Sequence, residues 1–470
     1  MEEKIFSAGF ARCKITPEKF GVPLRGYGAT HLRLSESVMD DLYAHILCLG
    51  NGDKAEVCLI TMDLTAVNDT LVAQCRAAVE EATGIPGERV LLGGTHTHSA
   101  PDYDSDMPII QEYLAYIVRQ VKATVPLAVQ DMKPAKIFFG SAEVGRPGVR
   151  LNFCRHYTIA ANSDANTETQ EKLIYCGDNF NDRLAGDKEH YHYVGHAQEV
   201  DPMLQVIRLE REGADNIIMV NWQSHAHIKG GSKKTFITAD FPGALVNKVE
   251  ALIPGSKCIY YNGACGNINP FSRMLSDSLP GLTFGPNRDH YAFAAVLGDY
   301  VRRANQNARE STTSTLDFRK RIVTCQRDHS MDHLVEEATL VRTIFMRDGY
   351  TQEVKDLCVK HGFNSPYQCG SIMAKAKAPA TGTVELNALR IGDVGYATSV
   401  GEFFNDLGEN IKKFSPFPMT FFKGYANGTG CYFPSAGSPE NTYERNTTRF
   451  VPGTGELLVQ NLVEMLTEMK

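Results

Sequence analysis

The chain has 470 residues, of which 43% are hydrophobic and 22% are charged, and its formal net charge at pH 7 is −7. That length is enough for one large core or for two domains, and the mild acidity argues against a nucleic-acid partner, which needs clustered lysines and arginines. The twelve cysteines form no CxxC pair, so we expect buried free thiols rather than a disulfide framework.

The first residues lack the features of a targeting segment. Two acidic residues open "MEEKIFSAGF", where a signal peptide carries basic residues, and no long apolar run follows. No stretch approaches the roughly 18–20 apolar residues of a membrane span. We therefore expect a soluble chain, cytoplasmic if this sequence is complete and secreted or periplasmic if it was trimmed. A homo-oligomer remains an option.

Strand and helix signals alternate along most of the chain. Asn68 and Asp69 predict a helix start before residues 70–83, and Gly84 predicts where that helix ends. The next amphipathic helix is predicted over residues 108–125. This alternation indicates an α/β fold, in which one mixed β-sheet catalytic domain is flanked by helices.

Four predicted strands are each followed by polar side chains. These strands open the segments 89–94, 216–227, 257–270 and 393–414. In open α/β sheets, ligands bind in the crevice at the carboxyl ends of the strands. We therefore expect the active site at this edge of the sheet.

Two segments depart from this alternation, within what we take as a single domain over residues 1–470. Residues 157–200 are polar and poorly periodic, which predicts an irregular surface excursion that shapes a substrate entrance. Residues 330–370 are predicted as a helical insertion, with helices over 332–349 and 351–362.

The densest chemistry in the sequence is a pair of His-x-His motifs. His96 and His98 share one face if the strand conformation continues through them, and His225 and His227 repeat the spacing after a second strand. Imidazole is a common zinc ligand, and Glu402, placed in the first turn of a helix, would add an oxygen ligand. The alternatives are histidines that cap buried backbone groups and a carboxylate that is favoured only by the helix dipole.

Seven short motifs in a fixed order resemble the neutral/alkaline non-lysosomal ceramidase family. They read "AGFARCKITP", "THTHSAP", "VNWQSHAH", "TADFPGAL", "NGACGNINP", "SVGEFF" and "GYANGTGCYFP". The resemblance implies a zinc amidase in which His96, His225, Glu402 and Tyr432 bind Zn²⁺. It also implies that His98 lines the pocket and acts on the scissile group. His225 is preferred to His227 as the metal ligand because of its spacing in the sequence from the Asn-Trp pair at the end of the strand.

The sequence departs from that family at the expected nucleophile. Asn269 in "GNINP" occupies the place of the family serine, and an amide side chain cannot be that nucleophile. Cys265 lies nearby but is expected to be a small buried residue. The family's carboxyl-terminal immunoglobulin-like domain also has no counterpart in these 470 residues.

These features together predict a zinc-dependent hydrolase that cleaves an amide (N-acyl) bond by direct attack of zinc-bound water. His98 would be the general acid or base, and Asn269 would donate its amide N–H to the developing oxyanion. Arg155 is a candidate for binding a substrate carboxylate or hydroxyl, or else a structural salt bridge. Two alternatives stay open. One is the same site acting on an ester, lactone or glycosidic bond of a small polar substrate, and the other is a non-catalytic ligand-binding homologue.

Overall fold

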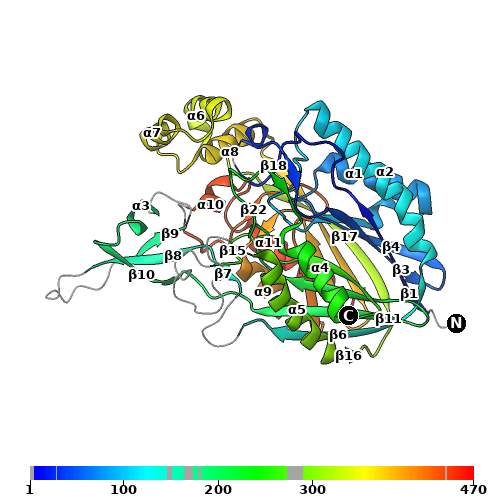
Figure 1. The fold of residues 1–470 in the computed structure, drawn as a ribbon. Helices are drawn as coiled ribbons and strands as arrows, with labels where there is room; N and C mark the ends of the chain where they lie inside the picture. The colour runs from blue at the N-terminus through cyan, green and yellow to red at the C-terminus, as the bar shows by residue number, and fades with distance from the viewer. Residues whose placement is uncertain are drawn as a thin grey trace.

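The computed structural model describes residues 5–27, 29–145, 151–162, 173–177, 182–271, 289–439 and 442–470. Two β-sheets stack face to face, and helices cover the outer face of each (Figure 1). The predicted α/β class with a mixed sheet and flanking helices is therefore confirmed, with two central sheets where we expected one. None of the described helices is both long and apolar enough to span a membrane.

The larger sheet contains nine strands, in the order β14-β12-β11-β6-β1-β3-β4-β5, with β16 paired to β6. In chain order these strands are β1 (Phe6–Lys14), β3 (Tyr43–Asn51), β4 (Lys54–Met62), β5 (Val90–Gly94), β6 (Lys133–Glu143), β11 (Met203–Arg211), β12 (Asn216–Trp222), β14 (Ser256–Asn262) and β16 (Arg309–Glu310). The β4–β5 and β12–β14 pairs are parallel and the others antiparallel. The carboxyl ends of β5, β12 and β14 deliver the site residues.

The second sheet pairs its four strands in the order β17-β18-β19-β21. They are β17 (Leu316–Gln326), β18 (Thr381–Ile391), β19 (Val394–Ser399) and β21 (Met419–Lys423). Apolar side chains of the two sheets meet in one cluster that includes Leu47, Phe139 and Phe421. Helices α9 (Asn405–Phe414) and α11 (Thr454–Thr467) pack on the other face of this second sheet.

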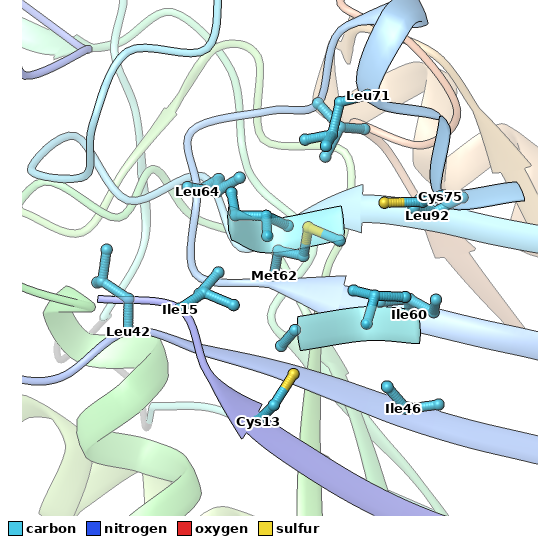
Figure 2. Close-up of a cluster of buried hydrophobic side chains, with 14 of the residues drawn as sticks. Cys13, Ile15, Leu42, Ile46, Ile60, Met62, Leu64, Leu71, Cys75 and Leu92 are labelled. Carbon is cyan, nitrogen blue, oxygen red and sulfur yellow. The ribbon is translucent and has the colours of Figure 1, made fainter. Parts of the chain in front are cut away.

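Strands of the large sheet are apolar on both faces because both faces are buried. In β3, Ile46 packs toward the helices while Leu47 packs toward the second sheet. The side-chain period of two in a strand makes neighbours point to opposite faces. Figure 2 shows part of the cluster on the helix side, to which Ile46 and Ile60 from the sheet and Cys75 of α1 all belong.

Local signals defined the helices well. The helix α1 (Asp69–Thr83) begins where predicted, with the Asn68 side chain accepting a hydrogen bond from the Leu71 amide at 2.8 Å. It ends at Gly84, whose φ of 74° suits glycine best. Helix α2 (Pro108–Gln130) lies beside α1 over β1 and β3 (Figure 1). On the same side of the sheet, α4 (Asp240–Leu252) and α5 (His290–Gln306) cover β6, β11 and β14.

Two peripheral segments differ from expectation. Within 157–200, three short strands form an antiparallel sheet in the order β10-β8-β9, so the expectation of an irregular excursion was wrong for these residues. The strands are β8 (Tyr157–Ala161), β9 (Ile174–Cys176) and β10 (Tyr191–His196). Their small core of buried and half-buried aromatic and aliphatic side chains explains why no clear alternation was visible.

The helical insertion contains one helix more than we predicted. It comprises α6 (Val335–Asp348), α7 (Gln352–His361) and α8 (Pro366–Ala376), which project from the body of the molecule (Figure 1). Ser365 caps the third helix and Pro366 occupies its first turn. This Ser-Pro start is an ordinary helix signal that extends the insertion to Ala376.

Candidate active site

His96 and His98 follow β5 in a turn rather than in a continued strand. The strand ends at Gly94, and His96 has a left-handed backbone with φ of 70°. The strand conformation therefore does not continue through His96 and His98, which was the condition for the two side chains to share one face of a strand. The turn nevertheless brings the two imidazoles together, with Nε2 of His96 3.1 Å from Nε2 of His98. The Nδ1 atom of His96 is held 2.9 Å from the Thr65 carbonyl oxygen.

His225 joins this pair from the end of β12. It is fully buried, and both its backbone N–H and its Nδ1 contact the Ile268 carbonyl oxygen at 3.0 Å. Ligand atoms of His96, His98 and His225 lie within 4.8 Å of one another, an arrangement that suits a metal ion. The structure places His227 outside this group, with its ring 5.5 Å from the ring of His98.

Glu402 completes the cluster from a short strand, not from a helix. We placed Glu402 in a first helical turn, but β20 (Glu402–Phe403) pairs in parallel with β22 (Tyr432–Phe433), and α9 begins only at Asn405. The helix-dipole explanation for its carboxylate therefore does not apply. Its Oε2 lies 3.6 Å from Nε2 of His96 and 3.5 Å from Nε2 of His225.

Two tyrosines hold the Glu402 carboxylate. Tyr432, opposite Glu402 in the β20–β22 pair, hydrogen-bonds to it, and the Tyr425 hydroxyl donates to Oε2 at 3.2 Å. Tyr425 also stacks on His96, with ring centroids 3.9 Å apart. Tyr425 was not among the site residues that we expected. Its position directly after Gly424 in a Gly- and Asn-rich loop was the available signal.

Burial sets the charge of these groups. It lowers the pKa of His96 to about 3, and it lowers the pKa values of His98 and His225 well below the ordinary value for histidine. Burial also raises the pKa of Glu402 to about 7, against hydrogen bonding from Tyr432. The imidazoles are therefore neutral near pH 7, which is the protonation state that binds metal ions.

The donor set fits a divalent transition metal. Carbonyl oxygens face Nδ1 of His96 and His225, which leaves the Nε2 lone pairs directed inward. At His225 the Nη2 of Arg155 lies 3.2 Å from Nε2 and can only donate to it, which requires the proton on Nδ1. A metal ion bound at Nε2 would replace this Arg155 contact. Imidazole nitrogens with one carboxylate are a typical ligand set for zinc, and such a set leaves a coordination position open.

Arg155 is at once a salt-bridge residue and a pocket residue. Its Nη1 donates to Glu444 at 2.8 Å, and His156 contacts the other Glu444 oxygen at 2.9 Å. Glu444 is fully buried. Burial works against charge on His156, but Glu444 raises the pKa of His156 to about 10. The sequence offered no signal for Glu444, because its two partners lie almost 290 positions away.

Two adjoining cavities, each of about 620 Å³, open onto the cluster. The first is lined by His98, Arg155, His227 and Asn269, and the second by His96, His98 and Glu402. Both cavities share a wall made by Gly26, Tyr27, His98, Tyr367, Tyr432 and Tyr443. The two cavities therefore lie next to each other at the cluster.

Asn269 lies in the wall of the first cavity. The short strand β15 (Ile268–Asn269) pairs with β7 (Phe153–Cys154), which fixes the Asn269 backbone beside Arg155. The side chain is 4% exposed, and its Oδ1 has no hydrogen-bond partner among the described residues. Cys265 is fully buried, contacts the Tyr425 hydroxyl through its sulfur at 3.0 Å and has a raised pKa because of burial. These features do not suit a nucleophile.

Comparison with solved structures identifies the fold. No family model matches the chain. Neutral ceramidase from Pseudomonas aeruginosa superposes with a TM-score of 0.70 at 16% sequence identity, over 100% of this chain and 75% of that one. A structure described as ceramidase complexed with C2 gives the same TM-score at 15% identity, over 99% and 75% of the two chains. The predicted resemblance is thus confirmed at the level of the fold, and this chain has the fold of the neutral ceramidases.

Proposed function

We propose that this protein is a metal-dependent hydrolase that cleaves an amide (N-acyl) bond, with Zn²⁺ as its metal. The observation that carries the proposal is the convergence of His96 Nε2, His225 Nε2 and Glu402 Oε2 beside the cavities, with His96 and His225 each 3.5–3.6 Å from the carboxylate oxygen. Support also comes from the fold, because both structural neighbours are described as ceramidases.

His96, His225 and Glu402 would hold the ion, with Tyr432 as the fourth ligand suggested by the sequence. A zinc ion in such a site lowers the pKa of a coordinated water and polarises a carbonyl oxygen. In the structure the Tyr432 hydroxyl is directed to Glu402. Tyr432 therefore serves at least to orient that carboxylate, and it is the member of the set whose removal should weaken metal binding least.

The remaining groups of the pocket supply positioning and proton transfer. His98 lies 3.1 Å from His96 and lines both cavities, so its imidazole is placed to move a proton between water and the leaving amine. Asn269 presents its amide at the same wall, where its N–H would stabilise a developing oxyanion. Arg155, anchored on Glu444, would orient a polar group of the substrate.

The nucleophile in this proposal is water, with no acyl-enzyme. Asn269 has no nucleophilic atom, and the Cys265 thiol is buried away from both cavities. We also propose a small, polar substrate, because arginine, histidine, asparagine and tyrosine side chains make up much of the walls. The same cluster would serve an ester, lactone or glycosidic bond, so the substrate panel must include these.

The test compares zinc content and turnover in the wild type, His96→Ala and Glu402→Ala. His333→Ala is the matched control, since it removes an exposed imidazole from the 3₁₀ turn before α6. The panel contains a short N-acyl amine, a long-chain N-acyl sphingoid base, an ester, a lactone and a glycoside. We expect amine release by the wild type and the control alone, together with loss of zinc from both site variants.

Three results would contradict the proposal in different ways. Full turnover by His96→Ala would exclude the metal site. Cleavage of the ester, lactone or glycoside without the amides would replace the amide bond as the target. Zinc binding with no turnover of any compound would favour a non-catalytic homologue.

A further inference from the structure

The second cavity contains a group of arginines that the proposed chemistry does not use. We call it the arginine cavity, meaning the hollow of about 620 Å³ lined by Arg342 and Arg449 as well as by His96 and Glu402. Arg342 comes from α6 of the helical insertion, and Arg449 follows α10 (Tyr443–Thr447). Segments far apart in sequence thus bring two guanidinium groups to a space that reaches the metal cluster.

Arg342 carries a charge that no acidic residue offsets. Among the described residues it makes no ion pair or hydrogen bond, and its buried Nη1 has no partner. Its guanidinium lies 5.1 Å from the centroid of the Phe345 ring. Arg342 as a whole is half-buried, and even partial burial of an unpaired cation is unfavourable, so a bound anion would relieve a penalty.

A third arginine of this cavity, Arg25, differs from Arg342 because it has acidic partners. Arg25 lines the arginine cavity too, but its guanidinium pairs with Asp102 at 3.0 Å and Asp104 at 3.8 Å. Arg449 is exposed and, like Arg342, has no ion-pair partner within the described parts of the chain. Arg342 and Arg449 therefore supply the unpaired positive charge among the described arginines that line this cavity.

We propose that Arg342 binds an oxyanion of the substrate, a carboxylate or a phosphate, while the scissile bond lies at the metal cluster. This inference rests on the proposed function and narrows its substrate class to anionic N-acyl compounds. The planar guanidinium matches either oxyanion with two parallel hydrogen bonds. Tyr432 and Tyr443, which line both cavities, would lie along the substrate between its charged and its reacting ends.

The activity test uses amides that differ only in charge. They are butananilide, 4-(butanoylamino)benzoate, 4-(butanoylamino)phenyl phosphate and glutaric acid monoanilide, so that the anion lies on either side of the bond. The wild type should prefer at least one anionic amide to butananilide in kcat/KM. Arg342→Gln should reduce this preference about tenfold or more, and Arg342→Lys should restore part of it. Arg347→Gln is the control, because it removes an exposed arginine from the same helix.

A binding test separates this inference from the proposed function. Isothermal titration of metal-free wild type with glutarate and with inorganic phosphate should show that at least one probe binds. Arg342→Gln should weaken binding about tenfold or more, while His96→Ala and Arg347→Gln should not. Thermal melts of each variant confirm folding. Equal binding by wild type and Arg342→Gln, or no binding by the wild type, would overturn the inference. Arg342-dependent binding without amide cleavage would refute only the proposed function.

Discussion

The assignment of His225 rather than His227 as a ligand can be tested by removing each imidazole. His225 is fully buried, faces the Ile268 carbonyl through Nδ1 at 3.0 Å and lies 3.5 Å from Glu402. His227 lies further along the same loop, 9% exposed, and stacks near Phe271 with ring centroids 5.4 Å apart. The two substitutions change the same chemical group two positions apart, so each is the control for the other.

The expected difference in zinc affinity between the two variants follows from whether the lost imidazole is a metal ligand. Loss of a residue that only orients a ligand typically costs about 10–100-fold in metal affinity. Loss of a ligand itself should exceed that range, so we expect His225→Ala to weaken zinc binding more than about 100-fold, or about 2.7 kcal/mol. His227→Ala should stay within about tenfold of the wild type. Competition against a chromogenic zinc chelator measures both. The reverse order of the two affinities would refute the assignment.

Three further predictions concern catalysis, helix capping and pH. Asn269→Ala should lower kcat about 10²–10³-fold with zinc content unchanged, in steady-state assays on whichever amide is cleaved, since one oxyanion donor is lost. Asn68→Ala should cost about 1 kcal/mol of unfolding free energy in urea, because the Leu71 amide loses its cap. While Glu444 is ionised it raises the pKa of His156 to about 10, so the ion pair contributes its full stability near pH 6.5 and loses it as the pH rises through about 10. His156→Gln should therefore destabilise the protein more at pH 6 than at pH 10.5, and equal effects would count against the ion pair.

Much of the fold was predictable because it depends on interactions between residues close together in the sequence. Helix α1 is specified by Asn68 before it and Gly84 after it, and both residues act within one turn of the helix end. The strands β5 and β12 are short apolar runs, and the two His-x-His motifs follow them within a few residues. In each case the deciding interactions lie within a few residues of one another. The packing of the second sheet against the first depends instead on an apolar cluster that joins residues far apart in sequence, such as Phe139 and Phe421, and no local pattern contains it.

The sequence indicated candidate site residues only where the residue type and its spacing are by themselves typical of metal ligands. His96 and His225 are visible because imidazoles are scarce and their spacing repeats. We placed Glu402 in a helix because its true strand conformation depends on pairing with Tyr432, thirty positions later, which no local pattern shows. Glu444 contacts Arg155 from almost 290 positions away, and Arg342 lines a cavity assembled from distant elements, so no sequence pattern indicates either residue.

Strained backbone conformations lie around the His96–His98–His225 cluster, and they bear on the proposal that the cluster is catalytic. Among the described residues, the non-glycine residues with positive φ are His96, Asp240, Tyr425 and Asn427. His96 and Tyr425 stack in the cluster itself, Asn427 accepts the Leu92 amide of β5, and Asp240 accepts amides of the loop that follows His227. Each such conformation costs about 1–3 kcal/mol and persists where the surroundings enforce it. All four lie in or beside the segments that carry the proposed ligands, and this strain supports the proposed catalytic site over a cluster that merely packs.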